Sequence, residues 1–482
     1  MIVLKFGGTS VGSAERVRRA ASIVEAQPLP RATVVSAASG VTNLLLAASS
    51  AAASGDRANR VLAVEEVRAK HGEVLAGVSD ERERLAAQAV LDQLHAALDE
   101  RLDEVAAAAA CDAAASDAIV ATGEKAMSVL MAATLRARGT PAVHAWADRV
   151  IATDDRHGHA RPQRERTRDQ AAALRPDLDA GVTVVMTGFI GGAPDGSTTT
   201  LGRGGSDYSA TLLGAALDAT EVQIWTDVPG VLTADPRQVP DARVVPHISY
   251  DEAQELAHFG AKVLHPRTIR PAVARGIPVR ILSTFAPDEP GTLVTREASG
   301  DHVKAVTALK HLLVLTIDVP ELEDLAGVSA LVFAALHHQR IEIAAVSQAS
   351  SRRRMTYLVD ASSHGGCANV SALLDDALAD HDVEADVRCE EGVALVAAVG
   401  HGAAAQSSGL ARMLDVLHRS GVAVLSSSLH HSNVALTAAV PANQADRAVL
   451  ALHEAFVRPL GGTVKGRRPR RSELLTETMR VG

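Results

Sequence analysis

The chain has 482 residues, of which 48 are Lys or Arg and 57 are Asp or Glu, for a formal net charge of −9. The length predicts roughly two to four domains. The net charge argues against a nucleic-acid partner, because a surface that binds a phosphate backbone needs an excess of basic residues. Aromatic residues make up only 2% of the chain, so side chains for stacking on bases are scarce.

Cysteine spacing and the N-terminal sequence predict the compartment. The cysteines Cys111, Cys367 and Cys389 are far apart and outside any Cys-x-x-Cys spacing. This predicts free thiols in a reducing compartment and argues against structural zinc. An apolar strand starts at Ile2 with no signal sequence before it, and no stretch has ~18 uncharged apolar residues in a row. We therefore expect a cytoplasmic protein with no membrane partner.

The first motif is a short apolar strand, Ile2–Phe6, which carries Lys5 and runs into Gly7–Thr9. Glycines let main-chain N–H groups approach an anion, and a lysine supplies a compact positive charge. A helix predicted over residues 13–25 adds its N-terminal dipole. A Walker A loop has Lys followed by Ser or Thr where Ser13–Ala14 stand, so this is a different loop. Taken alone, the turn fits a plain tight connection as well as a phosphate site.

Short apolar runs alternate with helical stretches over residues 1–295, which predicts an α/β domain with a mostly parallel sheet. A block rich in Ala, Leu, Glu and Arg at residues 43–110 has helical periodicity and is expected to insert two or three helices. Residues 295–301 are expected to form a linker. The predicted strands are Ile2–Phe6, Thr33–Ser36, Ala118–Ala121, Gly181–Gly188, Glu221–Thr226 and Val279–Leu282.

Beyond residue 301 the pattern changes to two copies of a strand–helix–strand–strand–helix order, typical of ferredoxin-like units. We expect one unit over residues 309–388 and another over 389–460, with a strand from 301–308 as an optional addition to the second. Residues 461–482 are expected to be a flexible tail. The predicted elements are Leu313–Val319, Ala326–Gln339, Ile341–Ser347, Met355–Asp360, Asn369–Ala379, Val383–Arg388, Val393–Gly400, Gly409–Arg419, Val422–Leu425, Asn433–Val440 and Ala445–Phe456.

The densest motif is Thr198–Asp207, which ends in Gly-Arg-Gly-Gly-Ser-Asp. Its glycines allow close approach of the backbone, and Arg203 offers a planar fork to a carboxylate or a phosphate. Ser206 is predicted to cap a helix running from Tyr208, and Asp207 adds a carboxylate near the phosphate charge. The structural alternative is a glycine-rich turn with a surface Arg–Asp pair.

Two further motifs follow. Thr226–Arg237 begins at the carboxyl end of a predicted strand, where parallel α/β sheets bind nucleotides, and Arg237 at its end is suited to phosphate. Phe259–Pro266 contains Lys262, for which a phosphate contact and a surface salt bridge both remain open.

Six motifs in this order are together similar to those of the aspartate kinases of the amino-acid kinase family, over nearly the whole chain. The resemblance implies a carbamate-kinase-like αβα sandwich followed by two ferredoxin-like βαββαβ ACT domains. It also implies phosphorylation of the L-aspartate β-carboxylate by ATP to 4-phospho-L-aspartate, with Mg²⁺ held by the ATP phosphates. This reaction begins the biosynthesis of lysine, threonine and methionine. The motifs are Lys5–Val11, Ser36–Asn43, Gly123–Lys125, Gly202–Asp207, Thr226–Arg237 and Phe259–Pro266.

The same resemblance implies roles for individual residues. Lys5 and Asp207 are the expected catalytic residues. Glu124 is expected to take the substrate ammonium and Arg203 a substrate carboxylate, while Leu232 replaces a tyrosine common in the family, which puts an aromatic contact to the nucleotide in doubt. The expected substrate-binding set is Thr42, Glu124, Arg203 and Ser206. The expected nucleotide-binding set is Lys5, Gly7, Gly8, Thr9, Thr226, Asp227, Arg237 and Lys262.

Tandem ACT-like units imply feedback control by an end-product amino acid and pairing between chains as a homodimer or homotetramer. Ala344 stands where an aspartate could meet a ligand ammonium, and Val346–Ser351 looks more like threonine-responsive members, so threonine is favoured over lysine. The alternative is that the candidate effector positions only pack a dimer. These positions are Gly327, Val328, Gln348 and Ser350.

Two other functions remain open at this point. One is a different amino-acid kinase, acting on glutamate, acetylglutamate, carbamate or UMP. The other is a non-catalytic regulator that binds an amino acid on a kinase fold. The presence of Lys5, Glu124, Arg203 and Asp207 favours catalysis over that regulator.

Overall fold

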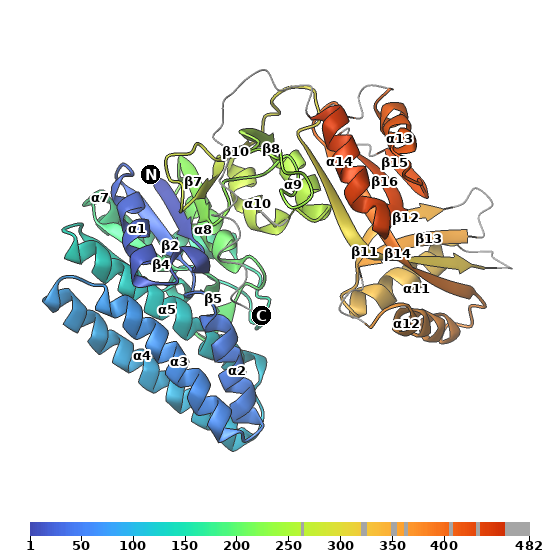
Figure 1. Ribbon diagram of the computed structural model, residues 1–482. Helices are drawn as coiled ribbons and strands as arrows, with labels where there is room; N and C mark the ends of the chain where they lie inside the picture. The colour runs from blue at the N-terminus through green and yellow to red at the C-terminus, as the bar shows by residue number, and fades with distance from the viewer. Residues whose placement is uncertain are drawn as a thin grey trace.

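The protein consists of an N-terminal lobe, drawn in blue and green in Figure 1, and a C-terminal lobe, drawn in yellow to red. Lys262, Ser350 and the predicted tail at 461–482 lie outside the residues that the structure describes. The computed structural model describes residues 1–261, 265–319, 325–348, 354–360, 365–403, 408–429 and 434–457.

An eight-stranded sheet forms the centre of the N-terminal lobe, in the order β3-β4-β2-β1-β7-β9-β10-β8. The first six strands in this order are parallel, whereas β10 is antiparallel to β9. The predicted mostly parallel sheet is therefore confirmed. Its strands are β1 (Ile2–Phe6), β2 (Arg31–Val35), β3 (Ala142–Ala145), β4 (Thr183–Thr187), β7 (Glu221–Thr226), β8 (His247–Ser249), β9 (Val279–Ser283) and β10 (Thr292–Thr295).

Helices cover both faces of this sheet, and the residues of β1 alternate between the two faces. Val3 packs in the same core cluster as Leu213 of α8, whereas Leu4 packs with Val17 of α1 on the other face. Side chains alternate along a strand, so Lys5 points to the same face as Val3, toward α8. The helices around the sheet are α1 (Ala14–Glu25), α5 (Ala113–Ala137), α6 (Arg164–Ala171), α7 (Arg175–Asp179), α8 (Gly205–Ala216), α9 (Tyr250–His258) and α10 (Pro266–Arg275).

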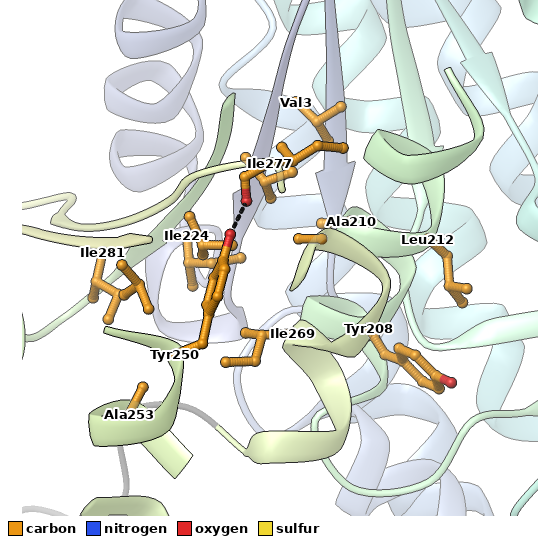
Figure 2. Close-up of a cluster of buried hydrophobic side chains, with 14 of the residues drawn as sticks. Val3, Tyr208, Ala210, Leu212, Ile224, Tyr250, Ala253, Ile269, Ile277 and Ile281 are labelled. Carbon is orange, nitrogen blue, oxygen red and sulfur yellow. Dashed lines mark hydrogen bonds between the residues drawn. The ribbon is translucent and has the colours of Figure 1, made fainter. Parts of the chain in front are cut away.

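Tyr250, at the start of α9, anchors that helix to the core on the α8 face. Its hydroxyl donates a hydrogen bond to the carbonyl oxygen of Ile277 at 2.6 Å, and its ring lies among the apolar side chains labelled in Figure 2. Burial raises the pKa of Tyr250, so the phenol stays a neutral donor. The position of α9 on the sheet is therefore well defined.

The block predicted to insert two or three helices forms three, and two of them make a long hairpin beside the sheet (Figure 1). Asp56 and Asp80 cap two of these helices, each accepting a hydrogen bond from the backbone N–H three residues on. The helices are α2 (Val41–Ala53), α3 (Arg57–Ala76) and α4 (Glu81–Ala108).

The prediction of a strand at Ala118–Ala121 is wrong, because these residues belong to helix α5. Asp112 caps the helix by accepting a hydrogen bond from Ala115 N–H at 2.7 Å. A short apolar run without polar alternation does not distinguish a buried strand from a buried helix. By length and composition α5 could cross a membrane, but 89% of its apolar window is buried inside the protein, where it packs as a core helix.

A six-stranded antiparallel sheet forms the C-terminal lobe, in the order β12-β13-β11-β14-β16-β15. Within the described part of this lobe four helices pack on the sheet, and they lie where the sequence predicted helices. The strands are β11 (Ala305–Asp318), β12 (Glu342–Gln348), β13 (Arg354–Asp360), β14 (Asp386–Val399), β15 (Ser426–Leu429) and β16 (Ala435–Pro441). The helices are α11 (Leu325–His338), α12 (Cys367–Ala379), α13 (Gly409–Arg419) and α14 (Ala445–Phe456).

Two long central strands run through both ACT-like units. β11 pairs with β14 from Ala305 opposite Val399 to Asp318 opposite Asp386, with register shifts around residues 309–314. The separate strands predicted at 383–388 and 393–400 are thus one strand, and the position expected to divide the units, between residues 388 and 389, lies inside it. The strand predicted at Val422–Leu425 is also wrong, since β15 begins at Ser426.

The two units are distinguished by their apolar cores. The described residues between 312 and 390 form unit 1, whose core is built from β12, β13, α11, α12 and the adjoining halves of β11 and β14. Unit 2 comprises residues 305–309 and 393–457, with the core built from β15, β16, α13, α14 and the other halves. Unit 2 is therefore assembled from two stretches of sequence that flank unit 1.

The cysteine prediction needs a correction. Cys367, at the start of α12, and Cys389, in β14, are joined by a disulfide, whereas Cys111 is a free thiol. The two cysteines are 22 residues apart in sequence, and the fold of unit 1 brings their Cα atoms to 5.4 Å. Spacing alone could not show this, because the pairing depends on α12 packing against β14.

Candidate active site

The glycine turn after β1 lies against the loop that follows β2. A Cβ atom at Gly8 would be 2.8 Å from the carbonyl oxygen of Ala37, so a side chain there would collide with backbone. The turn ends where Ser13 caps α1 by accepting a hydrogen bond from the N–H of Arg16. The sequence thus needs glycine at position 8 to bring two loops at the carboxyl ends of neighbouring strands together.

Lys5 and Asp207 form an ion pair across the space between β1 and α8. The Lys5 Nζ lies 2.7 Å from Asp207 Oδ1, and the two side chains are only 11% and 17% exposed. Asp207 lies in the first turn of α8, where main-chain N–H groups have no partner inside the helix. A positive side chain, a carboxylate and the positive end of a helix dipole therefore meet at one point.

The cap of α8 differs from the prediction. Gly204, with a left-handed φ of 69°, is the cap residue, and Ser206 already lies inside the helix, buried beside Gly188. Gly202 also has a left-handed φ of 75°, which explains the glycines on either side of Arg203. The Arg203 side chain itself is exposed. A hairpin, β5 (Ile190–Gly192) with β6 (Thr198–Thr200), leads into this loop.

Glu124 is a buried residue in the middle of α5. The side chain is 3% exposed, and its Oε1 accepts a hydrogen bond from the backbone N–H of Ala37 at 3.1 Å. Its Oε2 is buried with no hydrogen-bond partner among the described residues. Burial raises the pKa of Glu124 to about 8, although the Ala37 N–H acts in the opposite direction. An uncompensated carboxylate oxygen of this kind can accept from a cationic ligand.

The loop between β2 and α2 contacts Glu124 through Ala37 and leads into α2, which contains Thr42. Gly123 packs so closely on Ala37 that a Cβ atom would lie 2.8 Å from the alanine side chain. Thr42 follows Val41, the first residue of α2, after Gly40 in a left-handed conformation. The glycine turn, the Ala37 loop and Glu124 therefore occupy one end of the sheet, where the carboxyl ends of its parallel strands lie.

The candidate nucleotide segment starts at the end of β7. In the sheet, β1 separates β7 from β2, the strand that the Ala37 loop follows. The Thr226 hydroxyl lies 3.1 Å from Asp227 Oδ1, and the Thr226 carbonyl oxygen accepts from the N–H of Thr284. Arg237 is 88% exposed and pairs with its neighbour Asp235 at 2.6 Å. The guanidinium is thus held beside a carboxylate here, and the phosphate contact predicted for it remains untested.

The candidate effector residues lie in unit 1. Val328 is 3% exposed and belongs to the core of that unit, and Gly327 precedes it in α11. Gln348 is exposed at the end of β12, which is the edge strand of the sheet. The three residues are far in sequence from the Lys5–Asp207 pair and belong to the other lobe.

Sequence reasoning missed two polar clusters on α5, one around the buried Asp117 and one around the half-buried Lys125. Asp117 accepts hydrogen bonds from the backbone and hydroxyl of Thr200, from Gly158 N–H and from His157. Seven residues on from Asp117, on the same face of the helix, is Glu124. Reading residues 112–137 as one capped helix would have shown this spacing.

The second missed cluster surrounds Lys125. Its ammonium lies 2.7 Å from Asp148 Oδ2 and over the ring of Trp146, and the hydroxyl of Thr198 donates to the same carboxylate oxygen. This cluster ties α5 to the hairpin that leads to the Arg203 loop. The positive charge next to Glu124 in sequence is therefore neutralised by another residue.

A mostly parallel sheet with an ion pair and glycine turns at the carboxyl ends of its strands is typical of α/β enzymes that bind phosphate compounds. Comparison with known proteins identifies the family. The family model of the amino acid kinase family matches residues 1–283. The chain belongs to the amino acid kinase family. Within it, the relatives place the chain among the aspartokinases.

Among the relatives is the lysine-sensitive aspartokinase 3 of Escherichia coli, 36% identical over 83% of this chain and 87% of that protein. A bifunctional aspartokinase/homoserine dehydrogenase of Haemophilus influenzae is 32% identical over 95% of this chain, which spans 56% of that protein's length. A solved structure of E. coli aspartokinase III in complex with aspartate and ADP has 32% identity and a TM-score of 0.79, covering 94% of this chain and 99% of that one.

Proposed function

We propose that this chain transfers the terminal phosphoryl group of ATP to the β-carboxylate of L-aspartate, giving 4-phospho-L-aspartate and ADP. The observation that carries the proposal is the ion pair of Lys5 with Asp207 at the N-terminus of α8. The related E. coli structure, described as a complex with aspartate and ADP, supports this choice of substrates.

The chemistry requires positioning more than proton transfer. An aspartate side chain is ionised at neutral pH and is already a nucleophile, so no general base is needed. The barrier is then set by charge on the transferring phosphoryl group, which Lys5 and the α8 N-terminus would stabilise, with Gly7, Gly8 and Thr9 lining the turn beside it. Asp207 would keep the Lys5 ammonium in place.

Mg²⁺ would enter on the ATP phosphates. Among the described residues, no group of three or more His, Cys, Asp or Glu side chains gathers as a metal site. Mg²⁺ bound with a nucleotide needs only one or two carboxylates besides the phosphates and water, and Asp207 would supply one. The bound ion would neutralise phosphate charge, while the nucleotide would be held by Thr226, Asp227, Arg237 and Lys262.

The aspartate substrate would be held mainly by opposite charges. Among the described residues, one buried carboxylate oxygen of Glu124 has no hydrogen-bond partner, and this oxygen is suited to the substrate ammonium. Arg203 is exposed in a glycine-rich loop, where it is free to turn toward a substrate carboxylate. Thr42 and Ser206 complete the proposed site with hydroxyl groups.

Regulation by an amino acid bound to unit 1 is part of this proposal, as is pairing of two or four chains. The related E. coli enzyme is named lysine-sensitive and has been solved with lysine and aspartate, which supports lysine as an effector. The sequence of β12 and the residues after it favoured threonine, so both amino acids must be assayed. A cytoplasmic location remains our expectation from the sequence.

The activity is tested by two readouts on one reaction, ADP release and trapping of the acyl phosphate with hydroxylamine. Lys5→Ala should lower kcat by roughly 10²- to 10³-fold while aspartate binding stays within about twofold. Lys70→Ala, a lysine on the surface of α3, is the matched control and should keep full activity. Near-normal turnover of Lys5→Ala would refute the role of Lys5, and ADP release without acyl phosphate would refute aspartate as the acceptor.

A further inference from the structure

The second half of Thr226–Arg237 and the residues directly after it are packed into the core of unit 2. Ala234 and Val239 are 4% and 2% exposed, and both belong to the apolar cluster formed by α13, α14, β14 and β16. This end of the Thr226–Arg237 segment, which starts in the N-terminal lobe, therefore lies in the apolar core of unit 2. Figure 1 shows α14 and β11 on the side of that lobe that faces α9 and β8.

Thr233 is the polar centre of this contact. Its carbonyl oxygen accepts a hydrogen bond from Val306 N–H of β11 at 2.8 Å, and its N–H donates to the carbonyl oxygen of Arg243 at 2.9 Å. Its hydroxyl accepts from Arg243 N–H at 3.1 Å and lies 2.9 Å from Nε2 of His453 in α14. Both Thr233 and His453 are buried, at 5% and 2% exposure. Every polar atom of Thr233 is thus engaged, and two of them bind unit 2.

Charged groups extend the contact toward Arg237. Asp235 holds Arg237, and Lys310 of β11 pairs with Asp446 of α14 at 2.6 Å. The Arg237 guanidinium lowers the pKa of Asp235, and the more distant ammonium of Lys310 lowers it further, so these charges act on each other across the lobes. The conformation of the segment after Thr226 is therefore fixed by unit 2 as well as by the sheet on which it begins.

We propose that His453 is a positioning residue for the nucleotide: through Thr233, unit 2 holds the Thr226–Arg237 segment in the conformation that binds ATP. This rests on the proposed function, because that function assigns the segment to ATP. Unit 2 then supports the nucleotide segment from behind through Thr233, whereas unit 1 carries the candidate effector residues. Separating the hydroxyl of Thr233 from the imidazole should weaken ATP binding without affecting aspartate.

The test separates positioning from simple destabilisation by comparing the two substrates. His453→Leu removes the imidazole and Thr233→Val removes the hydroxyl at nearly constant volume. Each should raise the KM for ATP and the Kd for ADP by about five- to tenfold, with the KM for aspartate within twofold. The double variant should be no worse than Thr233→Val alone, because Thr233→Val already removes the contact with His453 together with the hydrogen bond from Arg243 N–H. His453→Gln, which can place an amide nitrogen near the position of Nε2, should recover most of the affinity.

The control is Leu417→Ala, which removes a fully buried apolar side chain from α13 in the same cluster. It should lower thermal stability and leave the ratio of the two KM values unchanged. The proposal is overturned if Leu417→Ala raises the KM for ATP as much as His453→Leu does, or if Thr233→Val folds normally and binds ADP like the wild type. If the wild type itself binds neither ATP nor ADP, both this proposal and the proposed function fail, whereas an active wild type with unaffected variants refutes this proposal alone.

Discussion

Aspartate binding should depend on pH through one buried group, Glu124. Burial raises the pKa of this carboxyl to about 8, and the proposed site needs its ionised form to accept from the substrate ammonium. Roughly a tenth of the ligand-free protein is then ionised at pH 7 and roughly a hundredth at pH 6. Apparent affinity is reduced by the fraction of competent protein, so the Kd for aspartate should fall about tenfold from pH 6 to pH 7 and level off above pH 8.

Isothermal titration of aspartate without nucleotide measures this directly. At pH 6.5, titrations in two buffers of different ionisation enthalpy should show the release of about one proton for each aspartate bound. Glu124→Gln is the matched variant, because its amide oxygen can keep the hydrogen bond from Ala37 while the charge is lost. It should bind aspartate more weakly above pH 8, and its Kd should be nearly constant from pH 6 to pH 9.

Two outcomes would contradict the reasoning. A wild-type Kd that is constant across this range would show that Glu124 is already ionised without ligand. A Glu124→Gln variant that retains the wild-type dependence would show that another group titrates. The second outcome would also require another position in the site for the substrate ammonium.

The remaining predictions concern stability. Because the pKa of Glu124 in the folded protein is raised above its ordinary value of 4.5, its contribution is complete below that value and is lost as the pH rises toward 8. Ligand-free wild type should therefore lose free energy of unfolding relative to Glu124→Gln over this range in urea titrations, and parallel curves would contradict this. Lys304→Met should cost about 3–5 kcal/mol, because Lys304 and Glu252 form an ion pair at 2.7 Å in which both side chains are at most 3% exposed. A loss below 1 kcal/mol in urea would mean that Glu252 is satisfied by its other contacts. Reduction of the Cys367–Cys389 disulfide should lower the stability of unit 1 by about 3 kcal/mol in the chain-entropy model. Cys389→Ser should show the same loss without reductant, and unchanged melting after reduction would count against a formed bond.

Local patterns made the site predictable one motif at a time. β1 reads as a strand because its apolar residues are continuous, and the glycines after Lys5 mark a turn in which position 8 has no room for a side chain. The glycines around Arg203 likewise mark left-handed positions. Their meeting at one end of the sheet follows from the rule for parallel strands.

Features that depend on distant packing could not be read from the sequence. Ala118–Ala121 fits a strand as well as a helix until the cap at Asp112 is considered. The polar Glu390–Gly392 stretch is typical of a turn, yet β14 continues through it. β11 pairs with β14 both before and after this stretch, and the register shifts between the two strands occur opposite it. The contact of Thr233 with His453 spans 220 residues and has no local signal.

The nesting of unit 1 inside unit 2 sets an order of assembly. The first strand of unit 2 begins at Ala305, but its partner residue is Val399, so this pairing closes a long loop whose entropy must be overcome. If unit 1 folds first, it shortens that loop to the few residues at its own ends. We expect hydrogen-exchange protection during refolding to appear in β13 before β16, so that unit 2, and with it the contact of His453 with Thr233, is completed only after unit 1 has formed.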